Sequence, residues 1–205
     1  MATFARIAIV LFVLFLVVIK ADPFISIALF ALALVLDAVD GYLAINEAST
    51  GRIGISEYLK SALGDAKQRK AVKEAKLNSS KLAKYGPRLD IIADRITEYS
   101  FWMLFTYLHI VPFFVLVIIV IRHSFADGFM GMKGTSSKMK TRFARALYGS
   151  NASRALANIL KFATFSYLIL EYVSGYPAIV GNALVGILVV FIVLRGAAEL
   201  YETLT

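Results

Sequence analysis

The chain has 205 residues, of which 59% are hydrophobic, and it carries a formal net charge of +8. This hydrophobic share exceeds the roughly 45–50% of soluble globular proteins, so the composition predicts a protein surrounded by lipid. The absence of cysteine from the sequence excludes disulfides, thiolate nucleophiles and cysteine-based zinc sites. The positive charge favours contact with anionic lipids or phosphorylated substrates, and no nucleic-acid-binding motif accompanies it.

Six apolar stretches are long enough to cross ~30 Å of hydrocarbon as helices of about 20 residues. Helices are expected because a spanning backbone must satisfy its hydrogen bonds internally, and the stretches are too long for barrel strands. The first stretch indicates a retained span, since no small-residue cleavage site follows it. The predicted fold is all-α, an integral membrane bundle of six transmembrane helices in a single domain, 1–205. The expected spans lie near residues 3–20, 23–45, 87–108, 111–132, 152–173 and 177–200.

Lysines and arginines gather in two segments, 46–89 and 122–154, which share one side of a membrane if the chain crosses it six times. The positive-inside rule makes that side cytoplasmic, together with both termini. The expected location is the plasma membrane of a prokaryote-like cell. Residues 46–85 form a cytoplasmic insertion between the second and third spans. The spacing of their apolar residues predicts an amphipathic helix on the membrane surface, or a solvated helix packed on the protein.

Two pairs of aspartates lie near the expected cytoplasmic ends of the second and third spans. Asp37 and Asp40 are three residues apart, and Asp90 and Asp94 are four apart, so each pair shares one helix face. Adjacent antiparallel helices would bring the four carboxylates together, where they repel one another unless they are protonated or hold cations. Oxygen ligands without histidine or cysteine favour magnesium, manganese or calcium over zinc. We expect a site for one or two Mg²⁺ or Mn²⁺ ions, which would also clamp a diphosphate.

The same aspartates could instead pair with Arg88, Arg95 or loop lysines and anchor the helix ends. One aspartate at a membrane boundary would favour that structural role. Four at these spacings favour a functional site, because ionisable groups within a membrane are costly. A carboxylate that is not fully engaged with metal could act as a base toward an incoming hydroxyl.

The pattern resembles the motif of the CDP-alcohol phosphotransferase family, D-x2-D-G-x2-A-R followed by G-x3-D-x3-D, which lies on the second and third of six transmembrane helices. The sequence departs from this motif in two ways. Ile45 stands in place of the motif's arginine, and the second half of the motif begins at Gly86, whereas the family's spacing of about eight residues between the halves would place it at Gly54. An insertion in a surface connection is tolerable, because the cost of loop closure rises slowly with loop length. The matching positions are Asp37, Asp40, Gly41, Ala44, Gly86, Asp90 and Asp94.

The resemblance implies that the four aspartates form the metal centre and that Asp94 is the general base. It implies that Gly41 and Gly86 let the cytidine nucleotide approach the backbone, although either glycine would equally suit tight helix packing. With Ile45 in place of the arginine, Arg52, Arg88 or a lysine of the insertion becomes a candidate for contact with the diphosphate. Homodimers are common in the family. The implied CDP-binding positions are Asp37, Asp40, Gly41, Ala44, Gly86 and Asp90.

Further cations lie on the expected cytoplasmic side. Arg122 ends the fourth span, while Arg154 and Lys161 are seven residues apart in the fifth and can share a helix face. Family members with phosphorylated acceptors use basic residues in this region. Anchoring of the helix ends by long cationic side chains is an equal explanation for Arg122 and Arg154.

The expected function is phospholipid synthesis: transfer of a phosphatidyl-type group from a CDP-linked lipid to a polar alcohol, with release of CMP. The acceptor alcohols include phosphorylated ones such as glycerol phosphate and inositol phosphate. The expected partners are these substrates and the bilayer, without nucleic acid. The alternative is a cation-coupled transporter that uses the aspartates as its ion site, which predicts polar residues or helix breaks along several spans. An inactive scaffold is a third hypothesis, based on Ile45 and the insertion.

Overall fold

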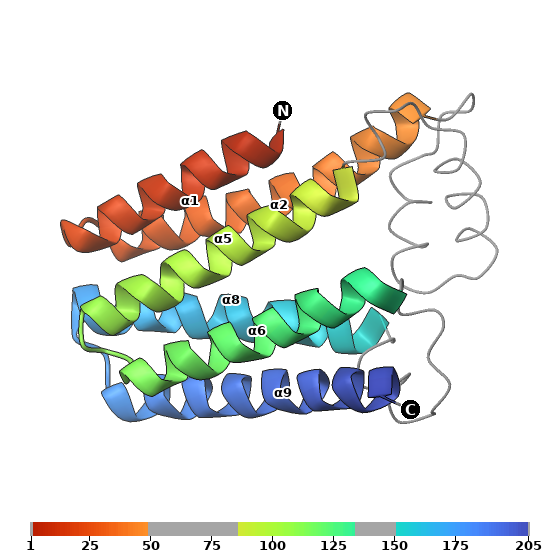
Figure 1. Ribbon diagram of the computed structural model, residues 1–205. Coiled ribbons are helices and arrows are strands. Elements are labelled where there is room, and N and C mark those ends of the chain that lie inside the picture. The colour runs from red at the N-terminus through yellow and green to blue at the C-terminus, as the bar shows by residue number, and fades with distance from the viewer. Residues whose placement is uncertain (1, 49–85, 134–150, 205) are drawn as a thin grey trace. The chain divides into compact units, whose positions relative to one another are not determined.

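The computed structural model describes residues 2–48, 86–133 and 151–204 (Figure 1). The regular structure in these ranges consists of six helices and contains no strand, which confirms the all-α prediction. The chain forms two compact units, Met1–Ser100 and Phe101–Thr205.

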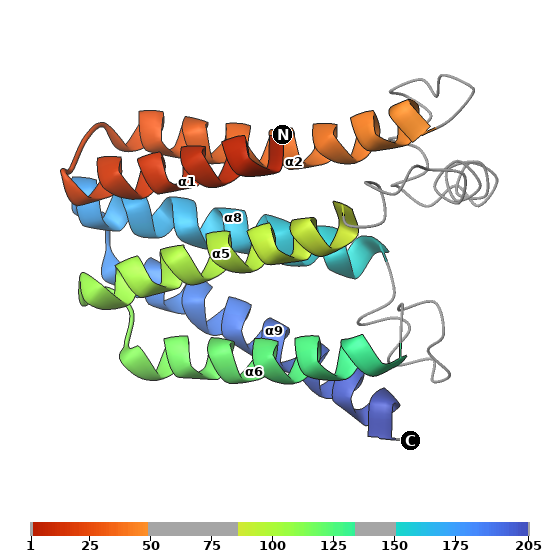
Figure 2. The same ribbon diagram turned by 45° about the horizontal axis from the view of Figure 1, so that its top comes forward.

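The first unit contains α1 (Ala2–Val18), α2 (Pro23–Ala48) and the first part of α5 (Gly86–Tyr107). α1 and α2 form an antiparallel hairpin whose helices pack along each other (Figures 1 and 2). The buried positions of α1 recur at intervals of three and four residues, which places them on one helix face. They are Arg6, Val10, Val13 and Val17.

A tight turn joins α1 to α2 because the chain ends one helix and caps the next within a few residues. Lys20 adopts the left-handed conformation, with a φ of 53°. Its N–H donates to Val17 O, and the N–H of Ala21 donates to Leu16 O, which together form a Schellman cap. Asp22 then caps α2, since its Oδ1 accepts from the N–H groups of Phe24 at 2.8 Å and Ile25 at 3.1 Å.

The second unit contains the end of α5, α6 (Phe113–Lys133), α8 (Asn151–Ser174) and α9 (Ala178–Leu204). α9 packs against both α6 and α8. The core joins α5 to α8 through aromatic rings: Phe165 stacks on Phe101 at 4.9 Å between ring centroids and meets the edge of Trp102 at 5.1 Å. These three side chains are buried, so this cluster is the packed centre of the unit.

Two further helix connections within the described ranges, from α5 to α6 and from α8 to α9, are also tight turns. His109, with a φ of 59°, ends α5 in a second Schellman cap formed by the bonds from its own N–H to Thr106 O and from Ile110 N–H to Phe105 O. Gly175, with a φ of 72°, ends α8, and Tyr167 Oη donates to Pro177 O across the turn. The gaps between the spans predicted at 3–20 and 23–45, at 87–108 and 111–132, and at 152–173 and 177–200 are thus turns between helices.

Two helical segments, Ala152–Ser174 and Ala178–Ala198, are long and apolar enough to cross a membrane. The apolar segments Thr3–Val18 and Pro23–Leu36 are shorter. Each of the six predicted spans coincides with a helix to within a few residues. Of the insertion predicted over 46–85, only the first three residues are described, and they form the end of α2.

Candidate functional site

The motif aspartates occupy positions in two continuous helices. α2 runs without a break through Asp37, Asp40, Gly41 and Ala44, and α5 begins at Gly86 and includes Asp90 and Asp94. The intervals of three and four residues therefore fall on helical backbone, where they place each pair of positions on one helix face. The helical prediction on which the shared-face argument depends is confirmed.

Within α2, the register of the aspartate positions continues that of the packed face. Ser26, Phe30 and Ala33 are buried at intervals of four and three residues. Positions 37 and 40 follow at the same intervals, so the helical register assigns them to this face. For seven predicted site residues the structure describes the helical backbone but not the surroundings: Asp37, Asp40, Gly41, Ala44, Gly86, Arg88 and Asp90.

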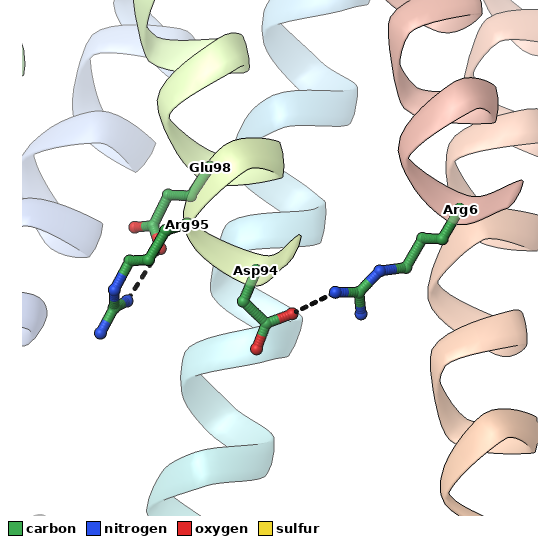
Figure 3. A network of polar contacts seen from close by, with 4 residues as sticks. All are labelled: Arg6, Asp94, Arg95 and Glu98. Carbon is green, nitrogen blue, oxygen red and sulfur yellow. Dashed lines mark ion pairs between the residues drawn. The ribbon is translucent and has the colours of Figure 1, made fainter. Parts of the chain in front are cut away.

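The side chain of Asp94 lies within the described part of the structure and is exposed to solvent. Its side chain is 61% exposed, and its Oδ1 lies 3.1 Å from Nη2 of Arg6 in α1 (Figure 3). On the same helix, Glu98, Phe101 and Phe105 are buried at intervals that continue from Asp94. The packed face of α5 therefore becomes accessible at the position of the predicted general base.

Arg6 is the buried partner in this contact, with a side chain that is only 4% exposed. It belongs to the buried face of α1, where the other members are valines. Arg6 was not among the residues predicted for the site. The available signal was its charge, because an ionisable residue inside an apolar span is costly to bury and is therefore a candidate for function.

A second ion pair lies one turn further along α5. Arg95 Nη1 is 3.9 Å from Glu98 Oε2, and the Glu98 side chain is 3% exposed. Figure 3 shows that the Arg95 side chain extends away from Asp94, whereas Arg6 reaches toward it. Of the alternative partners proposed for the aspartates, Arg95 therefore pairs with Glu98, and Asp94 pairs with a residue from another helix.

The predicted metal centre is only partly represented among the described side chains. Within that set, no three histidine, aspartate or glutamate residues gather as a metal site. Three of the four predicted ligands, Asp37, Asp40 and Asp90, are not in the set. Asp94 fits the predicted site as one ligand, because Mg²⁺ and Mn²⁺ prefer carboxylate oxygens and its side chain is open.

Three of the cations predicted to bind the acceptor, Arg122, Arg154 and Lys161, have side chains within the described part of the structure. Arg122 lines a largely apolar cavity of about 260 Å³ between α6 and α9, and Arg154 and Lys161 are not among its lining residues. The Arg122 side chain passes close to Gly196, whose Cβ, if present, would lie 2.9 Å from Arg122 Cγ. On α8, Arg154 is exposed and Lys161 is half-buried.

No protein-family model matches the chain, and no curated protein or solved structure matches it either. The features of the chain that bear on its function are therefore the aspartate positions in α2 and α5 and the contact between Arg6 and Asp94.

Proposed function

We propose that this chain is a membrane-embedded CDP-alcohol phosphotransferase that transfers a phosphatidyl-type group from a CDP-linked lipid to a polar alcohol. One observation carries the proposal: the two aspartate pairs of the motif fall on continuous helices at intervals that place each pair on one face. The open carboxylate of Asp94 adds to it, because a general base must be accessible to its substrate.

The proposal includes six membrane spans, one for each helix. The large apolar side chains on helix surfaces support it, since soluble proteins rarely expose many of them together. Phe4, Phe24, Phe113 and Ile179 are 67%, 66%, 68% and 78% exposed, respectively. Tight turns between consecutive helices also support it, because they leave short connections on one side of the membrane. The proposed setting is the plasma membrane, with the termini and the site facing the cytoplasm.

The positions of Arg6 and Asp94 along their helices agree with this topology. Arg6 lies in the second turn of α1, close to the terminus expected in the cytoplasm. Asp94 lies in the third turn of α5, whose start is expected on the same side. Both residues are therefore expected at a similar depth on the cytoplasmic side of the membrane, where their side chains can meet as they do in the structure.

In the proposed reaction, the acceptor hydroxyl oxygen attacks the phosphorus that carries the lipid. A new P–O bond forms to the acceptor, the P–O bond to the CMP phosphate breaks, and the hydroxyl proton passes to Asp94. Proton abstraction by a positioned carboxylate contributes typically about 10²–10⁴-fold in rate. A bound divalent ion would supply charge stabilisation to the diphosphate. Asp37, Asp40, Asp90 and Asp94 would hold it.

The test is release of CMP by the purified full chain in detergent. The donors are CDP-diacylglycerol and its ether-linked archaeal counterpart, with Mg²⁺ and a panel of alcohols that includes glycerol phosphate and inositol phosphate. We expect acceptor-dependent CMP release that falls by about 10²-fold or more in Asp94→Asn. Asp22→Asn is the matched control, because Asp22 caps α2 away from the motif and asparagine caps equally well.

Two results would contradict the proposal. The first is no CMP release with any donor and acceptor, and the second is full activity of Asp94→Asn. Cation flux through the protein in liposomes, combined with no CMP release, would favour the transporter instead.

A further inference from the structure

The two side chains in the contact between Arg6 and Asp94 differ in their exposure. The cation is 4% exposed, whereas the anion is 61% exposed. An ion pair with one exposed partner contributes little to stability, because solvent screens it. The contact places a buried cation 3.1 Å from an accessible carboxylate, so a ligand that reaches Asp94 would also come within range of the guanidinium.

The residue types define what that ligand would be. The guanidinium carries five N–H donors in a planar fork, which matches the oxygens of carboxylates and phosphates. Arg6 contacts Asp94 through Nη2 and thus holds a positive charge beside the position of the proposed base. The substrate of the proposed reaction brings a diphosphate to this position, and the motif arginine expected at Ile45 is missing from the sequence.

We propose that Arg6 is the diphosphate-binding cation of this site, and that its guanidinium moves from Asp94 to the phosphate oxygens when a nucleoside diphosphate binds. This inference rests on the proposed function. It assigns to α1 a contact that the family pattern would place on α2.

The charges at the site predict a coupling between ligands. With no nucleotide present, the guanidinium beside Asp94 opposes binding of a divalent ion to that carboxylate, because like charges within a few ångströms repel. A bound diphosphate draws the guanidinium to its own oxygens and removes that opposition. Arg6 should therefore weaken binding of the ion alone and strengthen binding of the nucleotide.

Two affinities measured on the full chain in detergent test this coupling. The first is the affinity for Mn²⁺ alone, measured from the electron paramagnetic resonance signal of the free ion. The second is the affinity for CDP at saturating Mn²⁺, measured by calorimetry. We expect Arg6→Gln to bind Mn²⁺ about tenfold more tightly than the unmodified protein. We expect the same variant to bind CDP about tenfold or more weakly, through the lost charge-assisted hydrogen bonds.

The controls separate ligand contact from support of the fold. Arg95→Gln removes a neighbouring cation that pairs with Glu98, and it should change neither affinity. Arg6→Lys keeps the charge but loses the planar fork, so it should keep the Mn²⁺ affinity and lose part of the CDP affinity. If Arg6→Gln fails to fold, the measurements on Arg6→Lys decide: CDP affinity equal to that of the unmodified protein overturns the inference.

Opposite changes in the two affinities support the role of Arg6, since general damage to the fold would weaken both. Unchanged affinities, or changes in the same direction, overturn it while leaving the proposed function intact if the unmodified protein binds both ligands and releases CMP. An unmodified protein that binds neither ligand and releases no CMP overturns the proposed function and, with it, this inference.

Discussion

The carboxylate of Glu171 in α8 lies close against Gly181 in α9. A Cβ atom on Gly181 would overlap Glu171 Oε2, and it would lie 3.2 Å from both Glu171 Cδ and Leu168 Cδ2. Small residues allow helices to approach closely, and this glycine does so for the hairpin of α8 and α9.

Glu171 Oε2 is the end of a flexible side chain that can move aside, so Gly181→Ala should lower the stability of the protein by up to about 1 kcal/mol, the low end of the range for overpacking. The measurement is thermal unfolding in detergent. The matched control is Gly186→Ala on the same helix, because no atom lies within 4 Å of a Cβ at that position. The control should be neutral or stabilising by up to about 1 kcal/mol, since alanine is the better helix former. Equal melting temperatures for the two variants would contradict this prediction and show that Glu171 and Leu168 make room for the added methyl group at no cost.

Phe165→Ala should cause the largest loss of stability among these variants. The ring contacts Phe101, Trp102 and Phe105, with centroid distances of 4.9, 5.1 and 6.0 Å. Truncation leaves a cavity in a packed cluster, which typically costs about 3–5 kcal/mol. Chemical denaturation followed by tryptophan fluorescence measures it, because Trp102 is the only tryptophan of the chain. Phe113→Ala, at a side chain that is 68% exposed, is the control, and an equal loss there would contradict the assignment of the core.

Asp22→Ala should cost about 1 kcal/mol of stability, because it removes the side-chain acceptor for two N–H groups at the start of α2. Asp22→Asn should retain most of that stability, since asparagine is an equally good cap. Thermal unfolding of the two variants provides the comparison. Loss of stability in both to the same extent would mean that the negative charge, and not the hydrogen-bond acceptor, stabilises the turn.

A double-mutant cycle with Arg6→Gln and Asp94→Asn should give a coupling energy below about 1 kcal/mol in unfolding free energy, because Asp94 is largely exposed. The same two variants should nevertheless change ligand binding strongly. The cycle requires unfolding curves for the parent, both single variants and the double variant. A coupling of about 3 kcal/mol or more, typical of breaking a buried pair, would make the contact a structural anchor.

The helices are predictable from the sequence because two local signals agree. Long apolar stretches favour helices, and Pro23 and Pro112 mark where the next helix begins, since proline is tolerated at the start of a helix but not in its interior. The expected span over 152–173 thus corresponds to Asn151–Ser174 in the structure. The end of α2 is less predictable: it continues to Ala48, three residues beyond the expected boundary, because no proline or glycine stops it there.

The contacts of the candidate site are less predictable than its helices. Spacing along one helix shows that Asp90 and Asp94 share a face, but it does not show which residue of another helix meets that face. The pairing of Asp94 with Arg6 depends on how α1 is rotated about its axis, and that rotation is set by packing along the whole helix. The left-handed conformations of Lys20 and His109 are also not predictable from the sequence, since glycine is the usual residue at such caps.

The tight turns have a consequence for the order in which the protein assembles during synthesis. α1 and α2 are consecutive, so their contacts can form as soon as both helices have left the ribosome. Such local contacts form quickly because little chain entropy is lost in closing the connection. α6 differs, because its partner α9 is made only after α8. Until α9 is synthesised, the face of α6 that carries Arg122 has no α9 to cover it, so the packing between these two helices forms later than that between α1 and α2.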